Sequence, residues 1–208
     1  MMFVEVFVPR GTLTHDQRRR VSERLMTGLM PEEGAPAESV EAARAFTQVV
    51  VHEPETWIVG GRSVAPTDPP RYVVRVSVPG AWRKEMSALI IPEVTRALAE
   101  IDPDPSRLYD ESHAWVHVVG IAEGSCGVFG QAMGSTDIVK VITKSYREGA
   151  QGDRTEDLPP GTALDPVCGM TVPLADAAKI VKQDGTTYAF CGSACHAVFA
   201  QDQRAAVH

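Results

Sequence analysis

The chain has 208 residues, and its 20 Lys and Arg against 27 Asp and Glu give a formal net charge of −7. This length suits one domain of about 140 residues with a small appended module. The acidic balance disfavours nucleic acid as a partner, and the sequence shows neither an apolar stretch of the ~20 residues that cross a membrane nor an export signal, so we expect a cytoplasmic protein without a membrane partner.

The first predicted elements are a strand, a helix and a second strand. Residues 3–9 alternate between apolar and other side chains, which is typical of a half-buried strand. A helix is predicted over about residues 14–29, where Thr14 and Gln17 can form a capping box. A second strand, over about residues 49–59, leads into a turn that contains glycine.

The same order of elements then repeats. Residues 73–79 match residues 3–9 with identity at four positions. A second helix is predicted over about residues 83–101, with Leu89 on its buried face, and Pro92 predicts a kink or a late start. A further strand and a glycine-containing turn follow this helix.

Two β-α-β units, residues 2–62 and 72–131, therefore follow one another. Strands joined through a helix are parallel within each unit. Two such units can pair into a four-stranded sheet with both helices on one face, so the sequence predicts an α+β fold.

This order of elements, and especially the turn at residues 123–130, resembles the tautomerase superfamily. The fused double-unit members, such as the macrophage migration inhibitory factor and carboxymethyl-hydroxymuconate isomerase groups, match the whole pattern, and 4-oxalocrotonate tautomerases match each half. The resemblance covers about residues 2–143. It implies a homotrimer, in which residues 136–142 cross to a neighbouring subunit as an edge strand or a helix.

The chemistry of that family depends on an N-terminal proline whose free amine has a lowered pKa and moves a proton between carbon and oxygen. Here Met2, preceded by Met1, stands at the equivalent position, so proline-based tautomerisation is not expected. The Met1 α-amine is a weak substitute base, with an unperturbed pKa of about 7.7 to 8.0. Other residues stand where the substrate-binding arginines would be expected: Thr12, Trp82, Phe46 and Trp115.

Cys126 lies in the second glycine-containing turn, and two interpretations of it stay open. It is either a small packed apolar side chain or a thiol that receives or passes a metal. In the second case His113 and His117, four residues apart and so on one face of the preceding strand, are candidate helpers.

Residues 144–164 are polar, rich in Gly and Pro and without an apolar period, which predicts a linker. This linker divides the chain into a first domain, residues 1–143, and a small second domain, residues 165–208.

The second domain contains Cys168, Cys191 and Cys195, with 22 residues between the first two and three between the last two. Thiolates are soft ligands that favour zinc or copper(I), and so short a segment usually needs a metal or a disulfide to fold. A helix over residues 193–201 would bring Cys191 and Cys195 to its N-terminus. A disulfide with one free thiol, or three packed cysteines, are the alternatives.

A β-hairpin is also predicted in this domain. Its strands cover residues 179–181 and 186–190, and Asp184 with Gly185 forms the turn.

The hexapeptide at residues 165–170, the aromatic residues before Cys191 and the helix after Cys195 resemble the YHS domain, a heavy-metal-associated module related to TRASH domains. The match covers about residues 165–200. It implies that Cys168, Cys191 and Cys195 bind a metal without naming it; from the softness of thiolates we expect one zinc or copper(I) ion per chain. The fourth ligand stays open. A helical neighbour points about 100° away from Cys195, which argues against His196. The other candidates are a water, a group from the first domain, Met170 and His208.

Two functions follow from these patterns. The first is a soluble metal-binding protein that handles or senses copper or zinc on a tautomerase-like scaffold without the catalytic proline. The second is a tautomerase or isomerase for a small carbonyl or aromatic-breakdown substrate, with the YHS module as a structural or regulatory attachment. The missing proline and arginines favour the first, so we lean toward a protein that is not an enzyme.

Overall fold

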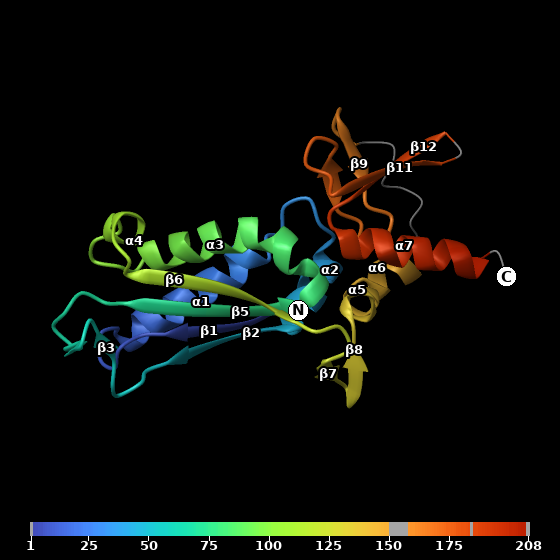
Figure 1. The fold of residues 1–208 in the computed structure, drawn as a ribbon. Coiled ribbons are helices and arrows are strands. Elements are labelled where there is room, and N and C mark those ends of the chain that lie inside the picture. Colours follow the sequence, from blue (N-terminus) through green and yellow to red (C-terminus); the bar gives the residue numbers. More distant parts are fainter. Residues whose placement is uncertain (1, 150–157, 184, 207–208) are drawn as a thin grey trace.

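The N-terminal part of the chain is built on a four-stranded sheet (Figure 1). The computed structural model describes residues 2–149, 158–183 and 185–206. The sheet has the order β2-β1-β5-β6, in which β1–β2 and β5–β6 are parallel pairs and the central β1–β5 pair is antiparallel. Each predicted β-α-β unit thus forms one parallel pair. The strands are β1 (Met2–Phe7), β2 (Thr47–His52), β5 (Tyr72–Pro79) and β6 (Ala114–Ile121).

Two long helices, α1 (His15–Leu29) and α3 (Arg83–Ala99), cover one face of this sheet (Figure 1). Thr14 and Gln17 form the predicted capping box at the start of α1. Apolar side chains from both helices meet every second residue of the central strands and make the main core. Members of this core include Val4, Val6, Val74, Val76, Val21, Leu25, Ile90, Val94 and Leu98.

Helix α3 differs from the prediction in two respects. It begins at Arg83, directly after a 3₁₀ turn η1 (Gly80–Trp82), and continues through Pro92, so the late start does not occur. Leu89 is 49% exposed, and its predicted burial is wrong. The buried stripe passes through Ile90 and the residues four and eight positions later, and its neighbour Leu89 points to a different face.

The opposite face of the sheet carries exposed apolar side chains. Phe3, Trp115 and Val119 are 37%, 58% and 40% exposed. They belong to the alternate positions of β1 and β6, whose other positions face the helices.

Residues 135–142 form a helix, which was one of the two predicted conformations. Helix α5 (Ser135–Ile142) buries Ile138 and Val139 within its own chain rather than leaving them for a neighbouring subunit. Several further elements were not predicted. They are α2 (Ala37–Ala45), β4 (Arg62–Ser63), α4 (Arg107–Asp110), β7 (Cys126–Val128) and β8 (Gln131–Met133). The strand predicted over residues 49–59 is divided, because β2 ends at His52 and Ile58–Val59 form a separate short strand β3.

Part of the predicted linker has regular structure. Helix α6 (Lys144–Glu148) and strand β9 (Thr162–Leu164) both lie within residues 144–164, and Tyr146 of α6 is buried. Residues 150–157 of the predicted linker lie outside the described residues.

The C-terminal region, described over residues 158–183 and 185–206, contains two short antiparallel pairs and a helix. Strand β10 pairs with β9, and the predicted hairpin forms from β11 and β12. Helix α7 begins where predicted and is longer than expected. Asp184 of the predicted turn lies outside the described residues. The bounds are β10 (Thr171–Pro173), β11 (Lys179–Gln183), β12 (Thr186–Phe190) and α7 (Ser193–Ala206).

The C-terminal region packs against the N-terminal part. Figure 1 shows α7 beside α5 and α6, and α7 also contacts η1. Trp82 of η1 and Val139 of α5 share a hydrophobic cluster with Val167, Phe190 and Val198. Among the described residues, no helix has the length and apolar character that a membrane span requires.

Candidate metal centre

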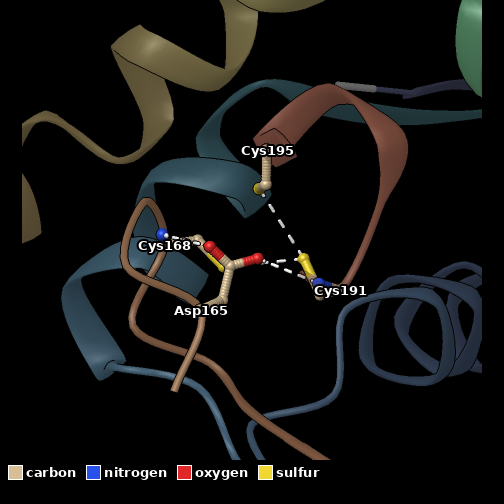
Figure 2. A group of neighbouring side chains, drawn as sticks. All are labelled: Asp165, Cys168, Cys191 and Cys195. Carbon is tan, nitrogen blue, oxygen red and sulfur yellow. Dashed lines mark hydrogen bonds between the residues drawn. The ribbon is translucent and has the colours of Figure 1, made fainter. Parts of the chain in front are cut away.

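Four side chains of the C-terminal region point toward one another in Figure 2. They are Asp165, Cys168, Cys191 and Cys195, and one ligand atom from each lies within 4.8 Å of the others. We call this group the Cys₃Asp cluster. The structure thus brings the three predicted cysteines together. Their binding of a metal stays a prediction.

The sulfur positions suit a shared ion. The Sγ atom of Cys191 lies 3.5 Å from Sγ of Cys168 and 3.7 Å from Sγ of Cys195. A tetrahedral ion with metal–sulfur bonds of about 2.3 Å places its sulfurs about 3.8 Å apart, whereas a trigonal arrangement with the same bonds gives about 4.0 Å. All three cysteines are free thiols, so the disulfide alternative does not describe this structure.

Asp165 organises the turn that carries Cys168. Its Oδ1 atom accepts hydrogen bonds from the backbone N–H groups of Val167, at 2.9 Å, and of Cys168, at 3.3 Å. The turn is closed by two backbone hydrogen bonds between Asp165 and residues 169 and 170. Gly169 has φ of 75°, a conformation that favours glycine. The hexapeptide that marked the YHS resemblance is therefore one compact turn.

Asp165 also links this turn to the second ligand-bearing segment. Its Oδ2 atom accepts a hydrogen bond from the backbone N–H of Cys191 at 2.9 Å. The side chain is completely buried. One carboxylate thus fixes the distance between Cys168 and Cys191, which are far apart in the sequence.

The start of α7 supplies the other two sulfurs. Cys191 precedes the helix by two residues and Cys195 lies in its first turn, as predicted. The backbone N–H of His196 donates to the carbonyl of Gly192 at 3.3 Å, which is the first bond of the helix. Cys195 is buried, Cys168 is half-buried and Cys191 is the most exposed residue of the cluster.

The fourth member of the cluster was not among the predicted ligands. The ring of His196 lies edge-on against Phe190, with centroids 5.2 Å apart, and His196 is not in the cluster. Met170 packs against a separate apolar group with Val172. His208 lies outside the described residues. The signal for Asp165 was its place three residues before Cys168, with a proline between them that favours a turn.

The charges within the cluster are coupled. Burial, with repulsion from the Cys168 thiolate, raises the pKa of Asp165 to about 6. Hydrogen bonds from the thiols of Cys191 and Cys195 lower the pKa of Cys168 to about 4. Because they donate to that thiolate, the pKa values of Cys191 and Cys195 lie well above the ordinary thiol value. Three thiolates beside a carboxylate would repel one another, and a bound cation would stabilise them together.

The other candidate site residues from the sequence analysis lie outside the Cys₃Asp cluster. Cys126 is in β7, and among the described residues no metal-binding group includes it. His117 is exposed beside Trp115, and Nε2 of His113 lies 3.2 Å from Glu111. Met2 is buried in the sheet core, whereas Met1 lies outside the described residues.

A second polar cluster is buried near α4, at the end of the sheet away from α7 (Figure 1). Asp102 accepts hydrogen bonds from the Tyr72 hydroxyl at 2.8 Å and from Nε of Arg107 at 2.8 Å. Arg107 also donates to the carbonyl of Pro70. These partners satisfy one another, which is typical of a structural cluster.

Comparison with known proteins gives a fold likeness for the N-terminal part of the chain. No protein-family model matches the sequence, and no curated protein matches it. Solved structures that resemble it include Pt0534 inactivated by 2-oxo-3-pentynoate, with 16% identity, a TM-score of 0.48 and coverage of 63% of this chain and 94% of that one. A member of the cis-3-chloroacrylic acid dehalogenase family has 17% identity, a TM-score of 0.47 and coverage of 63% and 82%. MIF2 of Leishmania major has 17% identity, a TM-score of 0.44 and coverage of 64% and 97%.

These similarities are low. They cover the N-terminal part and leave out the Cys₃Asp cluster.

Proposed function

We propose that the chain binds one metal ion per copy through Cys168, Cys191 and Cys195, with Asp165 as the fourth donor, and that it handles or senses this metal. The observation that carries the proposal is the convergence of four ligand atoms within 4.8 Å. Three thiols around a buried carboxylate are unfavourable without a cation, because each ionised group raises the free-energy cost of ionising the next. A bound metal ion accounts for this arrangement.

Zinc fits this donor set better than copper(I). The two sulfur separations, 3.5 and 3.7 Å, are close to the value of about 3.8 Å in a tetrahedral zinc site. A carboxylate is also a common ligand of zinc, whereas copper(I) is selected by soft ligands such as thiolates. A divalent zinc ion would also neutralise more of the negative charge of three thiolates and one carboxylate than a monovalent copper(I) ion would.

The exposure of Cys191 supports metal handling rather than a purely structural role. A structural zinc site is closed, whereas an ion that must be exchanged needs a route for an incoming ligand. We propose that this route passes Cys191, which is the most exposed residue of the cluster.

We propose that residues 1–143 form a tautomerase-like domain and residues 165–208 a YHS-like metal-binding domain, joined through residues 144–164. In support, the sheet core contains residues from Met2 to Leu108, and two separate apolar clusters lie under the C-terminal region. With Met2 buried where the family's proline stands, we propose that the first domain is a scaffold rather than an enzyme.

We also propose that this scaffold is a homotrimer. The argument is the sheet face opposite the helices, where Phe3, Trp115 and Val119 expose apolar surface. Exposed apolar patches on a protein surface are typical of contacts between subunits. Copies of the same chain are the simplest partners for this face.

Metal content of protein purified without an affinity tag tests the proposed function. We expect about one zinc or copper equivalent per chain and no enol-to-keto turnover of a phenylpyruvate-type substrate. Cys168→Ser, Cys191→Ser and Cys195→Ser should each lose the metal. Cys126→Ser is the matched control and should retain it. Turnover that persists in metal-free Cys168→Ser would instead support the tautomerase alternative.

A further inference from the structure

Helix α7 has no side chain of its own domain at its N-cap position. Gly192, whose carbonyl accepts the first helical bond from His196, occupies that position and cannot cap the helix with a side chain. The carboxylate of Glu85, from the first turn of α3, takes this place. It accepts hydrogen bonds from the backbone N–H of Ser193, at 3.2 Å to each oxygen, and from the Ser193 hydroxyl at 2.9 Å.

This cap lies between two members of the Cys₃Asp cluster. Ser193 stands midway between Cys191 and Cys195, whose sulfurs are 3.7 Å apart. The backbone N–H of Cys191 is held by Asp165 from the other side. Glu85 therefore fixes the one segment that joins these two cysteines, although it belongs to the other domain.

The turn that carries Cys168 is also held by the N-terminal part. The backbone carbonyl of Cys168 accepts a hydrogen bond from the Ser39 hydroxyl at 3.4 Å, and the backbone N–H of Thr171 donates to the carbonyl of Gly34 at 2.7 Å. A side chain at Gly169 would meet the ring of Tyr146 at 2.4 Å, so the turn is seated closely on α6.

We propose that Glu85 is a positioning residue for the metal site, and that metal binding and the docking of the C-terminal region against α2 and α3 strengthen each other. This inference rests on the proposed function. Both ligand-bearing turns are fixed by contacts with the N-terminal part, so an undocked C-terminal region loses part of the ligand geometry. By linkage, the factor by which docking strengthens metal binding equals the factor by which metal binding strengthens docking.

Zinc titration of the full-length protein against a competing chelator measures the first half of the proposal. Glu85→Ala should weaken zinc binding about tenfold, because outer-shell partners of metal ligands contribute factors of about 10 to 100 and this cap is at the surface. Glu85→Gln keeps one acceptor oxygen and should recover part of the loss. Glu100→Ala removes the same charge from the other end of α3 and should bind zinc as the wild type does.

Hydrogen exchange of the full-length protein measures the second half. Zinc should slow exchange of the backbone amides at residues 193–196 and at residues 34–40 in the wild type, and less so in Glu85→Ala. Wild-type zinc affinity in Glu85→Ala, or slowed exchange confined to the C-terminal region, would overturn the inference while leaving the metal site in place. A wild-type protein that binds no zinc or copper at all would instead refute the proposed function.

Discussion

Asp165→Asn gives the sharpest test of the Cys₃Asp cluster, because it separates the two roles of the carboxylate. Asparagine keeps the oxygen that accepts from Val167 and Cys168. Its amide nitrogen, however, cannot accept the hydrogen bond from Cys191, and it is a poor ligand for a metal. The variant should therefore retain the first turn and lose both the link to Cys191 and the fourth donor.

The effect on the metal-free protein can be worked out from the pKa of Asp165. With a folded-state pKa of about 6 against an ordinary value of 3.8, keeping the acid ionised at pH 7 costs roughly 3 kcal/mol of folding free energy, at about 1.36 kcal/mol per pKa unit. A raised pKa means that this cost is absent below pH 3.8 and grows until the pH passes about 6. At pH 4, where Asp165 is mostly protonated in the folded protein, the variant loses only a hydrogen bond between neutral groups, which contributes about 0.5 to 1.5 kcal/mol.

The metal-free variant should therefore be about 0.5 to 1.5 kcal/mol less stable than the wild type at pH 4 and roughly 2 kcal/mol more stable at pH 7. Urea unfolding with a chelator and a reductant present measures this difference, with Asp176→Asn, an exposed acid of the same region, as the control. Zinc binding near pH 7 should weaken at least tenfold in Asp165→Asn. Equal zinc affinity would remove Asp165 from the donor set, and a stability difference that stays constant with pH would refute the burial of an ionisable acid at this position.

Three further predictions concern the N-terminal part. Arg107→Ala leaves Asp102 buried without its ion pair and should cost about 3 to 5 kcal/mol in unfolding experiments. Burial is the largest single influence on the pKa of Asp102 and raises it, but hydrogen bonds from Arg107, the backbone of Asp104 and Tyr72 together lower it, so the wild type should lose stability as the pH falls below 3.8, and this loss should be smaller in the variant. Trp115→Glu, on the open face of the sheet, should convert the proposed trimer into monomers in light scattering after size exclusion, and an unchanged mass would contradict the proposed interface. Leu98→Ala should destabilise by about 2 to 5 kcal/mol, whereas Leu89→Ala should change thermal stability little, and equal losses would contradict the burial of α3 described above.

The sheet could be predicted because the pattern that indicates each strand lies within a few neighbouring residues of the sequence. Alternation in residues 3–9 and 73–79 reports which side of each strand is buried, and the intervening helical patterns require parallel pairs. The same local pattern did not resolve Leu89, because its neighbour Ile90 is equally apolar and only packing decides which of the two faces the sheet. It also did not reveal that Tyr146 is buried, since the partners of Tyr146 are distant in sequence.

The site, like the sheet, could be predicted only in part. The three cysteines could be predicted because thiolate spacing alone suggests a metal, and a helix start brings Cys191 and Cys195 together. Asp165 was missed because its role depends on the backbone of Cys191, which only the folded chain brings near. Glu85 gave no signal at all, because an exposed acid on a helix has many possible partners, and its partner Ser193 lies in the other domain.

The strand order has a consequence for how a single copy of the chain behaves in solution. Strand β6 ends the sheet, and among the described strands none pairs with its outer side. Its eight residues contain neither lysine nor proline, the usual protections against unwanted strand pairing. The outer side of β6 is therefore an edge to which a strand of another chain could add.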